Sequence, residues 1–234
     1  MKLPFTLEQF LDVFRQYNIS VWPMQIIWIV LALIATYFSI FKKSYSDKII
    51  VSVLAFLWLW MGIVYHLIYF SPINKAAILF GSLFIIQVLL LFYFGIIKDK
   101  LKFQFSLNRY GITGFVLILY ALIIYPLLAN LLGHVFPSSP TFGLPCPTTI
   151  FTFGILLFSS SRIPFIIIII PATWSVIGFS AVVSLGMKED TGLLIAGFVC
   201  TSMIIYKNTK LKKVSFSESS SVLIPVIFFL AYQF

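Results

Sequence analysis

The sequence predicts an all-α membrane protein: a bundle of about seven transmembrane helices. The composition is the first reason, because 61% of the 234 residues are hydrophobic and only 10% are charged. Soluble domains are roughly half apolar and about a quarter charged. The second reason is that the apolar residues form unbroken runs, each about 20 residues long, which is the length of a membrane-crossing helix. A transmembrane β-barrel would instead show alternating segments of about ten residues.

The expected spans follow from the hydropathy of successive windows of about 19 residues. The first 21 residues precede these spans as a separate surface helix, and residues 22–206 form the transmembrane domain. Residues 207–234 are expected to be a basic cytoplasmic tail, whose apolar end at 222–232 is re-entrant, interfacial or incidental. The expected spans are residues 22–41, 49–70, 76–97, 110–132, 144–158, 163–185 and 191–206.

The amino-terminal segment predicts a short amphipathic helix on the outer membrane surface. Thr6 and Gln9 have the spacing of a capping box, and Phe5 and Phe10 flank it as an apolar staple. Acidic residues interrupt the segment, so we expect an interfacial helix rather than a signal peptide. Such a helix can also be a lid without a direct functional role.

The formal net charge of +9 is explained by topology. Basic residues gather in alternate connections, which is the positive-inside pattern. The amino terminus is therefore expected outside and the carboxyl terminus in the cytoplasm, with the protein in a plasma or inner membrane. Nucleic acid is therefore not an expected partner, whereas the lipid bilayer is. The residues on the inner side are Lys42, Lys43, Lys48, Lys98, Lys100, Lys102, Arg109, Arg162, Lys207, Lys210, Lys212 and Lys213, against Lys2, Arg15, Lys75 and Lys188 outside.

Cys146 is the leading candidate for a functional residue. It lies in the uncharged stretch SPTFGLPCPTTIFTFG, between Pro145 and Pro147. Proline is favoured in the first helical turn, so Pro147 is expected to open the fifth span and to place Cys146 at its cap. There the positive end of the helix dipole favours a nucleophilic or metal-binding thiolate. Cys200 lies deeper along its span and is expected to be an unpaired packing residue.

Further polar residues are expected on the same outer side as Cys146. His66 and His134 each lie near the outer end of a span, and both could converge on the thiol. Thiolate and imidazole together suit a soft metal ion such as copper or zinc. Gln87 is expected near the middle of its span, where an amide turns inward and more often clamps two helices than lines a pathway. The remaining candidates for substrate or metal contact are Tyr65, Thr149 and Asn130.

Three functions of different classes remain open on these residues. The first is binding, transport or sensing of a small solute or soft metal ion at an outer-facing Cys/His pocket. The second is a membrane-embedded enzyme in which Cys146 is the nucleophile and His66 or His134 its base. The third is a non-catalytic structural subunit in which Cys146 fills a rigid turn. The ligand, the direction of any transport and the oligomeric state do not follow from the sequence.

Four strings also carry a resemblance to a known family. PFTLEQFLDVFRQYN, WLWMGIVYHLIYFSPIN, YPLLANLLGH and SPTFGLPCPTTIFTFG resemble small prokaryotic multi-pass membrane proteins that are catalogued as a domain of unknown function. The resemblance extends to about Tyr206. It implies a multi-pass helical membrane protein and carries no activity over to this chain.

Overall fold

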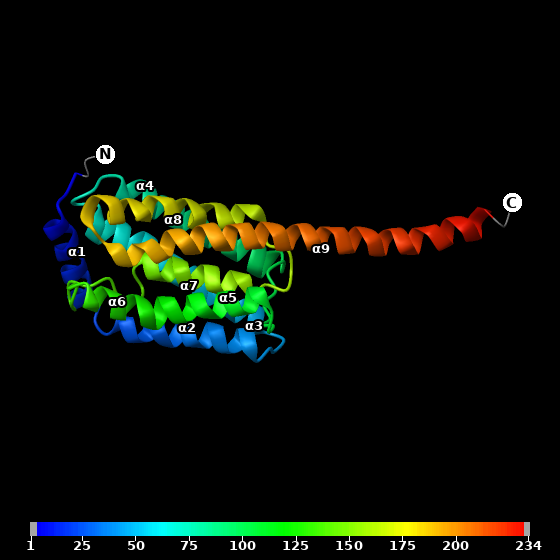
Figure 1. Cartoon of the computed structure of the whole chain (residues 1–234), viewed down its shortest axis with the longest axis horizontal. Coiled ribbons are helices and arrows are strands. Elements are labelled where there is room, and N and C mark those ends of the chain that lie inside the picture. The colour runs from blue at the N-terminus through cyan, green and yellow to red at the C-terminus, as the bar shows by residue number, and fades with distance from the viewer. Residues whose placement is uncertain (1–3, 232–234) are drawn as a thin grey trace.

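The computed structural model describes residues 4–231, with side chains up to Lys212. The described chain is all-helical, and its helices lie side by side with one short helix across an end of the bundle (Figure 1). The elements are α1 (Leu7–Ser20), α2 (Met24–Ile40), α3 (Ser46–Trp60), η1 (Met61–Phe70), α4 (Ala77–Leu91), η2 (Phe92–Ile97), α5 (Arg109–Leu119), η3 (Tyr120–Ile124), α6 (Tyr125–Leu131), α7 (Pro145–Leu157), α8 (Phe165–Leu185), η4 (Lys188–Asp190) and α9 (Thr191–Ala231).

Within the described residues, five helical segments are long and apolar enough to cross a membrane. A sixth span results if α1 and α2, which meet at 84°, are counted together. Each of the seven predicted spans coincides with a helix, but α7 has only 13 residues. The lengths and composition therefore indicate a helical membrane protein with five or six such spans. The five segments are Ser46–Phe70, Ala77–Ile97, Arg109–Leu131, Phe165–Leu185 and Lys188–Lys212.

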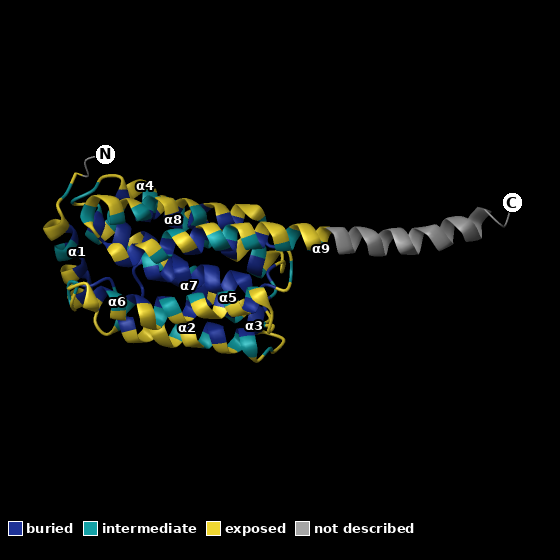
Figure 2. Ribbon diagram, in the orientation of Figure 1, coloured by how far each residue is buried: buried dark blue, intermediate teal, exposed yellow. Residues whose placement is uncertain are grey.

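The short helix α7 forms the core of the bundle. All its residues are buried except Cys146, which is half-buried, and Figure 2 shows it as a dark ribbon surrounded by partly exposed helices. It packs against α2, α5, α8 and α9. Because protein covers it on every side, α7 needs no lipid-facing surface, and its uniformly apolar sequence lacks an amphipathic pattern.

Polar groups within this core are satisfied by neighbouring helices. Thr152 Oγ1 accepts a hydrogen bond from Trp58 Nε1 of α3 at 3.0 Å and donates to the Thr148 carbonyl. At the other end of α7, the ammonium group of Lys207 donates to the carbonyl oxygens of Leu157 and Ser159. A cation at this position complements the negative end of the helix dipole. Residue 207 was expected to begin a separate tail, yet it lies within α9 and anchors the core.

The two ends of the bundle differ in charge. The basic end holds the connections 41–45, 98–108 and 158–164, and the cavity end holds α1 and the connections 71–76, 132–144 and 186–187. At the basic end, Asp47 is buried and accepts hydrogen bonds from Lys42 Nζ and from the Phe103 backbone N–H at 2.8 Å. This carboxylate therefore holds the connection 98–108 against the start of α3.

At the cavity end, α1 has the predicted cap. Thr6 Oγ1 accepts from the Gln9 backbone N–H at 3.3 Å, and the Gln9 side chain accepts from the Thr6 N–H at 2.9 Å. The rings of Phe5 and Phe10 stack with their centroids 5.6 Å apart, which confirms the apolar staple. The run at residues 222–232 lies outside the residues whose side chains are described.

Candidate functional site

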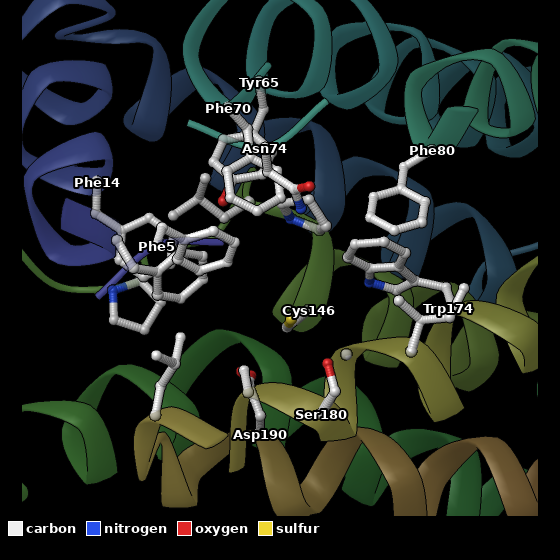
Figure 3. A pocket seen from close by; sticks show the side chains of 18 of the residues that line it. Phe5, Phe14, Tyr65, Phe70, Asn74, Phe80, Cys146, Trp174, Ser180 and Asp190 are labelled. Atoms are coloured by element: carbon white, nitrogen blue, oxygen red, sulfur yellow. The ribbon is translucent and has the colours of Figure 1, made fainter. Parts of the chain in front are cut away.

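A cavity of about 400 Å³ lies at the cavity end, between α1, η1, the start of α4, the start of α7 and the end of α8. Volumes of this order are typical of small-molecule sites. Aromatic rings and prolines form most of its wall, as Figure 3 shows for Phe5, Phe14, Phe70 and Phe80. The cavity therefore suits an apolar body, and its few polar groups determine what else it can bind.

Asp190 is the charged residue of the cavity. It belongs to the short helix η4 and is 2% exposed. Its carboxylate accepts a hydrogen bond from Tyr125 Oη at 2.5 Å. Among the described residues, no lysine or arginine lines the cavity. A buried carboxylate without a cation is costly, so this group favours either a bound proton or a ligand that carries a donor.

The neighbouring acidic residue has a different partner. Glu189 is fully buried, and its Oε1 lies 2.7 Å from His134 Nδ1. The Tyr120 hydroxyl also donates to the Glu189 backbone carbonyl at 3.0 Å. These contacts fix η4 against η3 and the connection 132–144, and they keep Asp190 in its position.

Cys146 also lines the cavity, at a position that differs from the prediction. The helix begins at Pro145, because Leu144 has extended backbone angles and forms the cap. Cys146 is therefore the second residue of α7 rather than its cap, and Pro147 is the third. Its thiol faces Asp190 in Figure 3. A carboxylate and an apolar wall disfavour a thiolate, so the activated cysteine expected from the helix dipole is opposed by its surroundings.

Trp174 joins this group from α8. Its Nε1 is buried and has no hydrogen-bond partner in the described part of the chain. A Cβ built on Gly178 would lie 3.6 Å from Cys146 Sγ and 3.8 Å from Trp174 Nε1, so both atoms border the same small space. The same Cβ would lie 2.6 Å from Leu193 Cδ2, so the glycine makes room for this leucine of α9 beside the thiol and the indole donor.

His66 lies behind this wall rather than in the cavity. It is fully buried in η1, with its ring against Trp174 and Phe84 at centroid distances of 5.0 and 4.7 Å. Neither ring nitrogen has a hydrogen-bond partner within the described residues. The histidine therefore contacts aromatic edges and does not face the thiol.

The other predicted residues divide between the cavity and the packing. Tyr65 lines the cavity, whereas Asn130 is exposed on the outside of α6. Thr149 is buried in α7, and its hydroxyl has no partner in the part of the chain that the structure describes. Gln87 donates from Nε2 to the Ile167 carbonyl at 3.0 Å, which confirms that it clamps α4 to α8.

The predicted metal ligands do not meet. In the described residues, no group of three or more histidine, cysteine, aspartate or glutamate side chains could hold a metal ion. His134 is paired with Glu189, His66 is enclosed by aromatic rings, and Cys146 faces Asp190. The site expected from Cys146, His66 and His134 is therefore not formed, and the thiol lacks an imidazole base. Both cysteines are free, as expected.

The connection before Cys146 is held in place by α1. Asn18 donates from Nδ2 to the carbonyls of Pro137 and Ser139 at 2.7 and 2.8 Å, and it accepts from Thr141 Oγ1. A protein side chain thereby satisfies two backbone carbonyls of this uncharged connection. Through Asn18, the helix α1 positions the connection that borders the cavity and leads into α7.

Sequence reasoning missed Asp190, Tyr125 and Trp174. The string Lys188-Glu189-Asp190 looks like an ordinary charged connection between two spans. The available signal was that two adjacent carboxylates stand beside a single lysine between two long apolar runs. A fully exposed turn does not need such a pair of acidic residues. Their burial depends on Tyr125 and His134, about 55 to 65 residues earlier in the chain.

Comparison with known proteins places the whole bundle in one family. Residues 7–215 match the family described as a family of unknown function, DUF6064, and the chain belongs to that family. No curated protein and no solved structure matches the chain.

Proposed function

We propose that this member of the DUF6064 family binds a small, mainly apolar molecule in the cavity, with a hydrogen-bond donor or cationic group of the ligand against Asp190. The observation that carries the proposal is a buried carboxyl group in a cavity with apolar walls, where among the described residues the Tyr125 hydroxyl donates to it and the Cys146 thiol faces it. A ligand amine or hydroxyl would supply the missing partner. The packed core around α7 lies between the cavity and the basic end, which favours binding or sensing over passage across the membrane.

The proposal can be tested with three eight-carbon probes that differ only in their end group: octylamine, octanol and octanoate. In a Cys200→Ala background, each probe should slow the alkylation of Cys146 by N-ethylmaleimide. Octylamine should protect best and octanoate least. A hydrogen bond to a charged group contributes about 1.5–3 kcal/mol. Asp190→Asn should therefore reduce protection by octylamine about tenfold or more.

Asp12→Asn is the matched control, because Asp12 is a carboxylate of α1 at the same end of the bundle whose side chain is 42% exposed. This variant should leave the order of the three probes unchanged. Equal protection by octylamine and octanoate, unaffected by Asp190→Asn, would contradict the proposal.

We also propose that the basic end faces the cytoplasm of a cell membrane and that the cavity end faces outward. The support is the charge difference between the two ends. In a cysteine-free background, new cysteines at Lys75 and Lys188 should react with an impermeant reagent added to intact cells. Cysteines at Lys43 and Lys100 should react only after permeabilisation. All four positions are exposed in the structure, so the reversed pattern would mean the reversed orientation.

A further inference from the structure

The helices α4 and α8 form one side of the cavity, and they are joined near their middle. Gln87 bonds to the Ile167 carbonyl at 3.0 Å, and Trp174 packs against Phe84 with a centroid distance of 5.1 Å. These contacts close the bundle below the cavity. Trp174 also contacts Phe80, at 5.4 Å, and both rings line the cavity.

Towards the cavity end, residues of both helices border the cavity and also reach the surface. Ala76, directly before α4, and Ser180 of α8 both line the cavity, and both are exposed. Ser180 lies on the wall opposite Asn74 in Figure 3. The cavity therefore reaches the surface near the start of α4 and at α8, at an opening here called the side portal and defined by Ala76 and Ser180.

The surface around the side portal is apolar. On α4, Ile78 and Leu79 are 53% and 61% exposed, and on α8 Val176 and Val183 are 64% and 74% exposed. Exposed aliphatic side chains on membrane-crossing helices face lipid. Ser180 lies five residues before the end of α8, a rise of about 8 Å at 1.5 Å per residue, which is within the depth of one bilayer leaflet.

We infer that the ligand of the cavity is a long-chain amphiphile that enters from the bilayer through the side portal, with its polar end at Asp190 and its chain directed towards the lipid. The inference rests on the proposed function and adds the class of ligand and its route. Apolar walls match the chain, and Asp190, Tyr125 and the unpartnered Trp174 Nε1 match a polar end that both donates and accepts hydrogen bonds. A solute from water would gain little from an opening that faces hydrocarbon.

The test uses Cys146 as a reporter inside the cavity. The full-length Cys200→Ala protein is reconstituted in phosphatidylcholine vesicles and treated with N-hexadecylmaleimide or with a sulfonated maleimide loaded on both sides by freeze–thaw. Each labelling rate is divided by the rate of the same reagent on the unfolded chain. Because both reagents carry the same reactive group, the intrinsic reactivity of the thiol then cancels in the ratio of the two rates. The hexadecyl reagent should label Cys146 faster than the sulfonated reagent.

Ser180→Trp should narrow the side portal and slow labelling by the hexadecyl reagent about tenfold, equal to about 1.4 kcal/mol in the barrier. Ile169→Trp is the matched control, because it adds the same side chain to an exposed position of α8 that lies outside the cavity lining and beyond Trp174 from Ser180. It should leave the rate unchanged. If Ser180→Trp does not fold, Ala76→Trp tests the same opening from the opposite side.

Faster labelling by the sulfonated reagent, or hexadecyl labelling that is indifferent to Ser180→Trp and Ala76→Trp, would overturn the inference. The proposed function would survive that result if octylamine still protected Cys146 in an Asp190-dependent way. Loss of that protection would instead remove the binding site itself, whatever the route to it.

Discussion

Replacing Gly154 with leucine is expected to prevent α7 from packing against α5. Gly114 and Gly154 face each other where these helices cross. A Cβ on Gly154 would lie 2.8 Å from the Gly114 carbonyl oxygen, and one on Gly114 would lie 2.6 Å from the Gly154 oxygen. Backbone atoms cannot rotate away, so the helices must separate. Alanine would regain about 1 kcal/mol of helix propensity against about 1–3 kcal/mol of overpacking, and leucine would exceed that cost.

This expectation can be checked by size-exclusion chromatography and thermal unfolding of the detergent-solubilised protein. Gly154→Leu should aggregate or unfold well below the parent protein, and Gly154→Ala should lie between them. Val116→Phe enlarges a side chain at an exposed position of α5 and serves as the control. A Gly154→Leu protein with the parent's Tm would show that α5 and α7 do not approach as closely as described.

The second large effect is expected for Asp47→Ala at the basic end. The substitution leaves the buried Phe103 N–H without its acceptor and Lys42 without its anion. An unsatisfied buried donor alone costs about 1–3 kcal/mol. The connection 98–108 should consequently loosen, and the free energy of unfolding should fall by at least that amount.

Asp99→Ala provides the comparison, because Asp99 also pairs with a lysine, Lys102, at 2.6 Å but is exposed. The hydrogen bond from Lys102 lowers the pKa of Asp99. Any stability from this pair is therefore present above the ordinary carboxyl pKa and is lost as pH falls through the lowered value. Solvent screens exposed pairs, which contribute little to stability, so unfolding in denaturant should separate the two variants. Equal losses of unfolding free energy in the two variants would mean that the burial of Asp47 adds nothing to the stability of the protein.

The elements of the fold could be predicted from sequence, whereas the place of α7 could not. Unbroken apolar runs identify helices, and the cap of α1 follows from Thr6 and Gln9 at their characteristic spacing. The residues that fill a protein core are the same types that face lipid, so the segment 144–158 looked like another span. Only its packing against α2, α5, α8 and α9 reveals a helix enclosed by protein.

The candidate site was predicted in part, because Cys146 and Tyr65 do line the cavity. Its other partners were wrong for a specific reason. Hydropathy and charge place a residue at one end of a bundle, but they do not determine the direction in which its side chain points. His66 therefore lies at the expected end of the bundle, but its ring packs against Trp174 and Phe84. Asp190 is buried by contacts with residues that are distant in the sequence.

The enclosed helix α7 has a consequence for biogenesis. Its 13 residues span about 20 Å, less than the roughly 30 Å of hydrocarbon in a bilayer. Such a segment has little affinity for lipid by itself when it leaves the ribosome. The helices α2, α3 and α5 precede it in the chain and can provide part of the protein surface on which it packs. The helices α8 and α9 follow it in the chain and complete its enclosure, so we expect stable insertion of α7 to require helices on both sides of it in the sequence.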